Sequence, residues 1–391
     1  MQLKRLQLNN FRNLHKGAID FPPGISIVLG HNGAGKTSLL EAAQFASCGR
    51  SFRTSREQEM VRAGAPFFRI EAEVGWNGTG LVRSVAYEQG SGVRTDTGGG
   101  PNWLPAGEVL CFSPDDLQLI KGPPARRRRF LDEAIGRRRP AYARNLLDYQ
   151  KVLTQRNSFL QRARAGLVRL QDVSPWDRQL AALAARIHAA RAEHCRVLAP
   201  CFREAYGEIA GATRATDVAY VSQLEGLGSG EGLEDRLVSA LEERWLDDLE
   251  RVTTGMGIHR DDVDFRLAGR SLKPFGSQGE QRAAVLALLL ADRRLVAETG
   301  EVPLLLLDDV MSELDPERRR SLLAALAGNG NRGAEGGSAE GAGRAAGTAA
   351  QAIITAADAG LFSEEDLSGA SVFEVEDGAV RLTKAGPDAR A

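Results

Sequence analysis

The sequence of 391 residues lacks any apolar run approaching the roughly 18 residues that a membrane-spanning helix needs. Its first residues, MQLKRLQLNNFRN, also lack the long apolar segment of a signal peptide. Cysteine is scarce, and no two of the four cysteines are spaced as C-x-x-C. These absences predict a cytoplasmic protein without a membrane partner. Its thiols are expected to be reduced and structural, at Cys48, Cys111, Cys195 and Cys201.

Net charge and aromatic side chains are also low, and both bear on nucleic-acid binding. The formal net charge is −1, so the field of the whole molecule does not attract DNA, and any DNA binding must come from local basic patches. Aromatic residues make up 6% of the chain, which argues against recognition of single strands by base stacking. The apolar fraction of 43% is that of a soluble globular protein.

A phosphate-binding pattern stands near the start of the chain. The segment GHNGAGKT, residues 30–37, fits G-x-x-x-x-G-K-[ST], follows an apolar strand and opens a helix expected to end at Gly49. Its glycines let backbone N–H groups face phosphate oxygens at a helix N-terminus. Lys36 is expected to bind the β- and γ-phosphates, Thr37 to ligate Mg²⁺ and Ser38 to reach the α-phosphate. The predicted nucleotide site comprises Gly30, His31, Asn32, Gly33, Ala34, Gly35, Lys36, Thr37 and Ser38.

The segment LLLLDD, residues 304–309, provides the second half of such a site. Four apolar residues predict a buried strand, and Asp308 at its end can hold Mg²⁺ as a Walker B aspartate does. Asp309 is then placed to orient or deprotonate the attacking water. A pair of carboxylates that caps a following helix is the alternative. Because adjacent carboxylates repel each other, a bound cation is the simpler way to keep both ionised.

The region between the two motifs has the character of long helices from about Pro140. Apolar residues at alternating spacings of 3 and 4 predict antiparallel helices, with breaks at Pro175 and Pro200. His194 falls in this apolar seam, as a core histidine rather than a metal ligand. We expect residues 1–138 and 255–391 to form a discontinuous α/β head and residues 139–254 a mainly helical lobe. The Gly- and Ala-rich stretch 328–350 is expected to be a flexible insertion.

A second anion-binding loop, FGSQGEQR, covers residues 275–282 and leads into a helix. One chain does not need two phosphate loops for the same nucleotide. If two copies meet face to face, however, each Ser277 loop can close over the γ-phosphate that the other copy's Lys36 holds. ATP would then hold two subunits together, and loss of the γ-phosphate would release them. This arrangement predicts an ABC-type P-loop ATPase head.

The chain resembles the RecF family of bacterial recombination and gap-repair ATPases, which are related to the SMC and Rad50 heads. The resemblance covers almost the whole length. It rests on the following segments: LQLNNFRN, GHNGAGKTSLLEAAQFASCGRSFR, FSPDDLQLIKGPPARRRRFLDEAIG, TTGMGIHRDD, FGSQGEQRAAVLALLLA and LLLLDDVMSELD. The segment ITAAD departs from related heads because it lacks their switch histidine.

The resemblance implies an ATP-dependent homodimer that binds DNA, hydrolyses ATP slowly and with stimulation by DNA, and helps to load the recombinase on gapped DNA. RecR and RecO are the implied partners, in DNA replication, repair and the SOS response. Phe11 to Asn13 would lie near the adenine. The residues that would act in trans are Ser277, Gln278, Gly279 and Glu280 of the signature loop and Asp315 of the D-loop.

Seven arginines form the densest basic clusters, and a looser set at Arg50, Arg53 and Arg56 follows the P-loop helix. They could neutralise several DNA phosphates, with steep salt dependence. A solvated helix face paired with Asp132 and Glu133 is the alternative, and the family resemblance favours contact with duplex DNA. The predicted DNA-binding residues are Arg126, Arg127, Arg128, Arg129, Arg137, Arg138 and Arg139.

Three other functions fit parts of the sequence. An ABC transporter subunit would be compact, whereas here more than 100 residues separate GRSFR from the signature loop. A structural SMC protein would need long arms, but each arm here has at most ~55 residues, or about 80 Å. An ATP-gated structural clamp with incidental hydrolysis keeps the same fold, and it stays open as an alternative.

Overall fold

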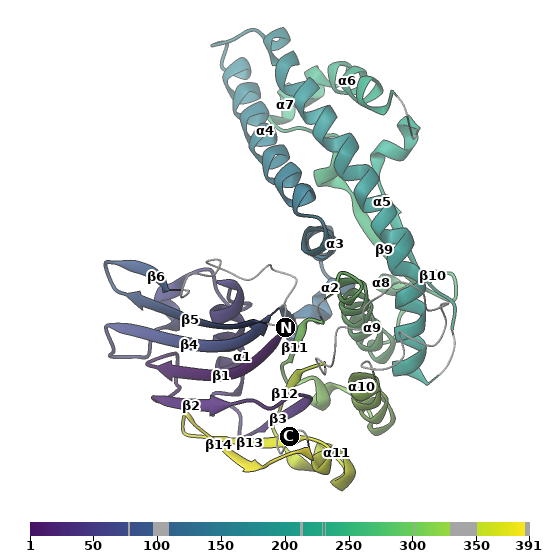
Figure 1. Cartoon of the computed structure of the whole chain (residues 1–391). Coiled ribbons are helices and arrows are strands. Elements are labelled where there is room, and N and C mark those ends of the chain that lie inside the picture. The colour runs from purple at the N-terminus through teal and green to yellow at the C-terminus, as the bar shows by residue number, and fades with distance from the viewer. Residues whose placement is uncertain are drawn as a thin grey trace. The chain divides into compact units, whose positions relative to one another are not determined.

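A computed structural model describes residues 1–76, 79–96, 109–211, 214–228, 230, 232–300, 302–328 and 350–387 (Figure 1). These residues fall into two compact units. The first contains Met1–Leu117, Glu204–Thr213 and Gln278–Ala391, and the second contains Gln118–Arg203 and Arg214–Ser277. The insertion predicted for residues 328–350 lies outside the described residues except at its two ends.

The first unit contains a six-stranded sheet in the order β14-β13-β3-β12-β11-β7 (Figure 1). All its strands are parallel to their neighbours except β14, which pairs antiparallel with β13. The central strand β3 therefore lies between two strands from the far end of the chain. The strands are β3 Ile25–Leu29, β7 Val109–Phe112, β11 Leu304–Leu307, β12 Ala352–Ala356, β13 Ser371–Glu376 and β14 Ala379–Lys384.

A second sheet of the first unit is antiparallel, in the order β2-β1-β4-β5-β6. Its strands are β1 Gln2–Asn9, β2 Gly17–Asp20, β4 Phe67–Trp76, β5 Thr79–Glu88 and β6 Gly92–Asp96. Helix α1, Lys36–Cys48, contacts strands of both sheets, and ten of its residues are buried. As predicted, Gly49 ends α1, in a left-handed conformation with φ 68°.

Three further helices belong to the first unit: α9 Gln278–Ala297, α10 Pro316–Gly328 and α11 Glu364–Ser368. Helix α9 packs on β7, and its apolar residues are buried around much of its circumference. Strands β3 and β11 lie on either side of β12, and they place the two nucleotide motifs at the carboxyl ends of parallel strands of one sheet. Ligands bind at this edge in open α/β sheets.

The second unit is built mainly from helices. These are α2 Gln118–Lys121, α3 Pro124–Arg138, α4 Pro140–Arg164, α5 Ser174–Ala210, α6 Leu233–Glu243, α7 Trp245–Arg251 and α8 Leu272–Phe275. The end of α5, from Glu204, belongs to the first unit. The unit therefore begins before residue 139 and ends after residue 254, because α3 packs on α4 and on β9 rather than with the head.

A three-stranded sheet accompanies these helices in the order β10-β9-β8. Its strands are β8 Thr216–Val221, β9 Asp262–Leu267 and β10 Arg270–Ser271. The sequence analysis predicted β9 but placed it in the head, and it missed β8. The helix break predicted at Pro200 is wrong, because α5 continues through it. Leu198 and Phe202 are fully buried beside this proline, and their packing offsets the lost hydrogen bond.

A buried ionic network joins the helices of the second unit. The Arg156 side chain is inaccessible to solvent and donates through Nε to Asp177 at 2.6 Å. Its Nη1 donates to Asp248 at 2.7 Å and to Thr254 Oγ1 at 2.8 Å. Burial raises the pKa of Asp177, and Arg156 acts against that shift. One cation therefore compensates two buried carboxylates on α5 and α7.

His194 is buried in α5, as the apolar seam predicted. Burial lowers its pKa to about 4, and the nearby charges of Arg138, Arg139 and Arg137 act in the same direction. Within the described ranges no group of histidine, cysteine, aspartate and glutamate side chains is arranged to hold a metal ion. In the same ranges no helix is both long and apolar enough to cross a membrane.

Candidate nucleotide site

The loop between β3 and α1 has the conformation that its glycines permit. Gly30, Gly33 and Gly35 have φ values of 156°, 82° and 123°, in a region that residues with a Cβ rarely adopt. A Cβ atom at Gly30 would lie 2.4 Å from the carbonyl oxygen of Val375. His31 and Asn32 are exposed at the outer side of the loop, before the first turn of α1. The loop thus requires glycine for both its turn and its close packing on β13.

Lys36 begins α1, and its side chain turns back along the loop. Its Nζ donates to the carbonyl oxygens of Gly30 at 2.6 Å and His31 at 3.0 Å. Burial lowers the pKa of Lys36, while the charges of Asp309 and Asp308 raise it. The ammonium group is therefore held inside the loop, close to both carboxylates.

Thr37 brings the two sequence motifs together. Its hydroxyl lies 3.0 Å from Asp308 Oδ1 and 2.9 Å from Oδ2. The backbone N–H of Asp308 donates to the carbonyl of Phe112 at 2.8 Å, which fixes the end of β11 beside β7. Burial raises the pKa of Asp308, and its hydrogen bonds to Thr355 and Thr37 act against the shift. A hydroxyl and a carboxylate thus meet at the N-terminus of α1.

Asp309 occupies an unusual backbone conformation next to this pair. Its φ is 49°, in the left-handed region, where a residue other than glycine costs roughly 1–3 kcal/mol. Its N–H donates to Thr355 Oγ1 at 2.9 Å, and the same hydroxyl donates to Asp308 Oδ1 at 2.8 Å. Within the described part of the chain, Asp309 Oδ1 is buried without a hydrogen-bond partner. Such strain and such an orphaned acceptor are typical of functional sites.

Asn13 also supports the loop, a role that the sequence analysis did not assign. Its Nδ2 donates to Gly33 O at 2.8 Å, and its Oδ1 accepts from Ser38 Oγ at 2.9 Å. Phe11 is fully buried and packs edge-to-face on Phe68, so its ring belongs to the core. The position of Phe11 to Asn13 near the adenine stays a prediction.

The turn between β13 and β14 supports the same loop from the other side. Gly378 N donates to Ala34 O at 3.2 Å, and Gly378 O accepts from His15 N at 2.8 Å. Gly378 has φ 78°, and a Cβ atom there would lie 2.1 Å from the carbonyl oxygen of Asn13. The pair Asp377-Gly378 is a hairpin signal that the sequence analysis missed.

Gly378→Ala is therefore expected to weaken nucleotide binding as well as stability. The left-handed φ alone costs about 1–2 kcal/mol with a side chain, and the overlap with Asn13 adds to it. The matched control is Gly269→Ala, in the β9–β10 hairpin turn, where φ is 76° and a Cβ atom meets nothing within 4 Å. Thermal unfolding and ATP titration should show that both variants lose stability and that only Gly378→Ala loses affinity. Equal ATP affinity in the two variants would contradict the support role.

Glu41 binds Arg53, one of the looser arginine set, and also Arg12. Its side chain is inaccessible to solvent and accepts from Arg12 at 2.9 and 2.7 Å. It also accepts from Ser51 at 2.5 Å and from Arg53 at 3.4 Å. Arg53 thus has an acid partner within the chain, and its charge opposes the raised pKa of Asp308. Arg53 belongs to the surroundings of the nucleotide site.

The signature loop lies at the start of α9. Ser277 is exposed immediately before the helix, and Gln278 is its first residue. Arg318 Nη1 lies 2.6 Å from the place of a Cβ atom on Gly279, and the same guanidinium pairs with Asp315 at 3.3 Å. Asp315 also accepts from Arg318 N at 2.9 Å, at the start of α10.

One further ion pair, between Arg282 and Glu313, connects α9 to the segment that contains Asp315, just before α10. The first unit therefore brings Gly279, Arg282 and the D-loop residue Asp315 to one place, as a connected polar group. The sequence spacing alone could not predict this, because the rest of α9, strand β11 and a short 3-10 helix separate these residues in the chain.

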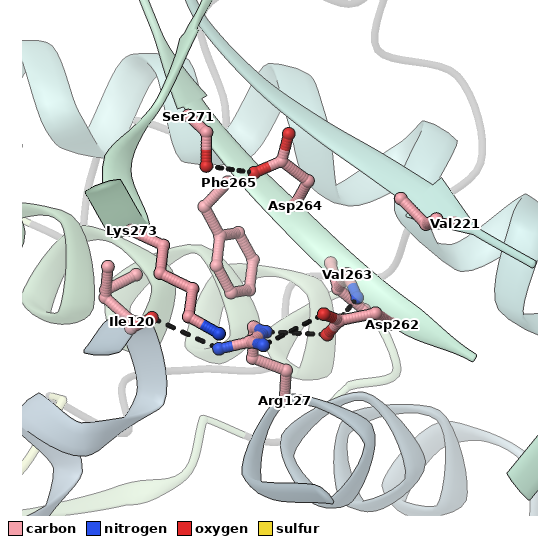
Figure 2. A pocket seen from close by; sticks show the side chains of 9 residues that line it. All are labelled: Ile120, Arg127, Val221, Asp262, Val263, Asp264, Phe265, Ser271 and Lys273. Carbon is pink, nitrogen blue, oxygen red and sulfur yellow. Dashed lines mark hydrogen bonds and ion pairs between the residues drawn. The ribbon is translucent and has the colours of Figure 1, made fainter. Parts of the chain in front are cut away.

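The structure corrects the predicted DNA-binding set at Arg127. Figure 2 shows its guanidinium at a cavity of the second unit, facing Asp262 and close to Lys273. It donates to the two oxygens of Asp262 at 2.6 and 2.9 Å, and Nη1 donates to the carbonyls of Ile120 and Gly122. With a side chain only 3% exposed, Arg127 cannot reach DNA in this structure.

The helical period could have separated Arg127 from its neighbours. It shares a face of α3 with Leu131, Ala134 and Ile135, all of which are buried. The other six arginines remain a prediction. Arg126, Arg129 and Arg139 are exposed, whereas Arg128, Arg137 and Arg138 are half-buried. Arg128 donates to Asp261 O at 2.7 Å, and burial lowers its pKa. Arg129 and Arg137 pair with Glu133 at 2.9 and 3.6 Å.

A family model and curated relatives both match this chain. Residues 5–95 match the family model of an AAA domain. The DNA replication and repair protein RecF of Heliobacterium modesticaldum is 35% identical over 384 residues, which cover 97% of this chain and 98% of the relative. The chain belongs to the RecF family. The RecF of Symbiobacterium thermophilum is 39% identical over 339 residues, 83% of this chain and 88% of that protein.

Solved structures extend the RecF match to three dimensions. A structure of the recombination mediator protein RecF-ATP in the RecFOR pathway is 30% identical, with a TM-score of 0.81, and it covers 98% of this chain and 97% of that one. An SMC head bound to the C-terminal winged-helix domain of ScpA is 14% identical with a TM-score of 0.58, which supports the fold alone. The predicted fold, an ABC-type head with a helical lobe, is confirmed.

Proposed function

We propose that this chain is an ATP-dependent, DNA-binding protein of recombinational repair and gap repair whose ATP-bound form is a homodimer. The contact between Thr37 and Asp308 carries the proposal, because it joins the phosphate loop to the Walker B strand at one point. Family membership supports ATP binding and a role in DNA replication and repair. Slow hydrolysis stimulated by DNA, the partners RecR and RecO, and a cytoplasmic location are the finer parts of the proposal.

The residues at this junction fit ATP with Mg²⁺. The positive-φ loop and the N-terminus of α1 offer backbone N–H groups to phosphates. Lys36 is placed to bind the β- and γ-phosphates in exchange for its two carbonyl partners. The Thr37 hydroxyl and the Asp308 carboxylate are hard oxygen ligands of the kind that Mg²⁺ takes. When bound, Mg²⁺ would neutralise charge that develops on the phosphates. We assign Asp309 the role of orienting or deprotonating the water molecule that attacks the γ-phosphate.

The signature loop is proposed to act in trans. Ser277 is exposed at the N-terminus of a 20-residue helix, where a γ-phosphate from a second copy would be favoured. Gln278, Gly279 and Glu280 would complete that surface, with Asp315 beside them through Arg318. Binding of duplex DNA is assigned to Arg126, Arg129 and Arg139, with Arg128, Arg137 and Arg138 as half-buried neighbours.

Sedimentation of the wild type with ATP, with ADP and without nucleotide tests the dimer. ATP alone is expected to double the mass. Ser277→Arg should abolish this change while ATP still binds, because the bulky arginine side chain prevents the loop from closing over the γ-phosphate of the second copy. Ser158→Arg, at an exposed serine of α4, is the matched control and should dimerise normally.

Two results would overturn the assignment of the trans loop. One is a wild type that stays monomeric with ATP at concentrations that saturate the site. The other is a Ser277→Arg variant that dimerises as the wild type does. In either case the family fold would remain, and the ATP-dependent dimer would not.

A further inference from the structure

The segment ITAAD lacks the switch histidine of related heads, and the structure places a threonine hydroxyl beside both acidic residues of the nucleotide site. We infer that Thr355 is a positioning residue, which sets the orientation of Asp308 and Asp309 through a single hydroxyl group. This inference rests on the proposed ATPase function. The hydrogen bonds of the Thr355 side chain go to Asp308 and Asp309 and not to the P-loop.

Thr355 is the one polar residue of an otherwise apolar strand. It is the fourth residue of β12, the strand between β3 and β11, and each of the five residues of β12 is buried. Ile354, its neighbour in the strand, pairs in register with Leu307, which immediately precedes Asp308. In such a strand a polar side chain is costly unless its hydroxyl is satisfied. The strand position thus delivers one hydroxyl to the end of β11.

The direction of both hydrogen bonds follows from the donor inventory. A backbone N–H can only donate, so Thr355 Oγ1 accepts from Asp309 N at 2.9 Å. The single hydroxyl proton is therefore directed at Asp308 Oδ1, at 2.8 Å. Consequently, one oxygen atom fixes the carboxylate of Asp308 and the peptide that begins Asp309.

The bond from Asp309 N to Thr355 Oγ1 holds a strained residue. Asp309 has φ 49°, and its Oδ1 is buried without a hydrogen-bond partner among the described residues. The bond from Asp309 N to Thr355 secures the peptide at which the left-handed turn begins. If that bond is lost, the strain can relax, and the carboxylate of Asp309 can move from the position proposed for contact with water. Misplacement of a catalytic group by about 1 Å can cost roughly 100-fold in rate.

Thr355 can also affect hydrolysis through Asp308, the carboxylate that contacts Thr37. Asp308 Oδ1 accepts a hydrogen bond from Thr355 Oγ1, and both Asp308 carboxylate oxygens lie within 3.0 Å of Thr37 Oγ1. Thr355 thus restrains the rotation of the carboxylate that is proposed to hold Mg²⁺ together with Thr37. Support of this kind behind a metal ligand typically contributes about 10–100-fold in metal affinity or activity.

A buried threonine that merely satisfies the core would make the same bonds, so the test needs variants that separate the two roles. Thr355→Val keeps the shape and removes the hydroxyl, and Thr355→Ser keeps the hydroxyl. Thr216→Val is the matched control, because Thr216 is a buried strand threonine of the second unit. Its Oγ1 has no hydrogen-bond partner within the described ranges.

Two readouts are measured on the full-length protein: ATP turnover, and the ratio of ATP dissociation constants with EDTA and with Mg²⁺. Thr355→Val should lower kcat at least tenfold and lower the Kd ratio several-fold, while the affinity for ATP in EDTA stays within about threefold. Thr355→Ser should restore both quantities to within about threefold, and Thr216→Val should leave both unchanged. Wild-type turnover in Thr355→Val, or equal losses in the valine and serine variants, would overturn the inference.

The outcome also separates this inference from the proposed function beneath it. If Asp309→Asn stops turnover and Thr355→Val does not, only the inference about Thr355 fails. If neither variant changes turnover, the proposed site itself is wrong. Should the valine variant unfold below the assay temperature, Thr355→Cys provides the same test, because a thiol is a weak donor and acceptor. The cysteine variant should then lose turnover and the serine variant should not.

Discussion

Asp309→Asn is expected to lower the rate of ATP hydrolysis by about 100- to 10,000-fold, the range that a positioned general base contributes. Asparagine keeps the shape and removes the charge, so it can orient a water molecule but cannot take its proton. Asparagine also tolerates the left-handed φ of 49° found at this position. The backbone and the bond from residue 309 to Thr355 should therefore persist, and the loss should appear in kcat rather than in ATP affinity.

The same variant should hold the ATP-bound dimer. If hydrolysis releases the subunits, then slower hydrolysis leaves more protein in the dimer, which sedimentation with ATP would measure. Asp377→Asn is the matched control, an exposed aspartate with φ 46° in the β13–β14 turn. It should hydrolyse ATP at the wild-type rate. Normal turnover in Asp309→Asn would remove the assignment of the base and would favour an ATP-gated clamp whose hydrolysis is incidental.

Arg156→Met should have the largest effect on folding. Methionine keeps the apolar stem but leaves the carboxylates of Asp177 and Asp248 buried without their cation, and removal of one partner from such a group costs about 3–5 kcal/mol. Urea unfolding followed by the signal of the second unit would measure the loss. Arg169→Met is the control, since Arg169 is an exposed arginine that pairs with Asp172 at 3.4 Å. It should change the unfolding free energy by less than about 1 kcal/mol. Equal midpoints for the two variants would show that the network is not what stabilises the lobe.

The loss in Arg156→Met should depend on pH in a defined direction. Burial already raises the pKa of Asp177 above its ordinary value of 3.8, with Arg156 acting against the shift. Without the arginine the folded-state pKa rises further. A carboxyl group with a raised folded-state pKa contributes stability below its unfolded pKa, and that contribution is lost as the pH rises through the folded value. The difference between the variant and the wild type should therefore shrink as the pH is lowered toward 4.

Local patterns in the sequence predicted those parts of the molecule that depend on neighbours in the chain. The strand, loop and helix around Gly30–Ser38 follow from an apolar run, three glycines and the stop at Gly49, all within about 25 residues of each other. The Walker B strand and the long helices of the lobe follow from the same kind of evidence. Asp308 and Thr37 could be paired in advance only because each belongs to a motif of known geometry.

The remaining features depend on contacts between distant parts of the chain, which spacing does not encode. Thr355 reaches Asp308 over 47 residues, and Gln351 Nε2 reaches the carbonyl of Leu3 over 348. Gln351 stands in no motif, and Thr355 lies in the segment ITAAD, whose only noted feature was the missing histidine. Arg127 was misjudged for a different reason, because a run of four arginines conceals which of them faces inward. The β8 strand was missed since helices precede and follow it.

The strand order of the nucleotide-binding sheet also has a consequence for synthesis on the ribosome. Strand β3 emerges early, yet both of its neighbours, β12 and β13, are among the last segments to be made. The bond between Thr37 and Asp308 spans 271 residues, and at translation rates of about 5–20 residues per second this delay is on the order of 15 to 55 s. During that time both edges of an apolar strand stay unpaired, and such edges promote aggregation. The nascent head is thus a candidate for chaperone binding, whereas the lobe, whose described segments lie between Gln118 and Ser277, can fold before the nucleotide site closes.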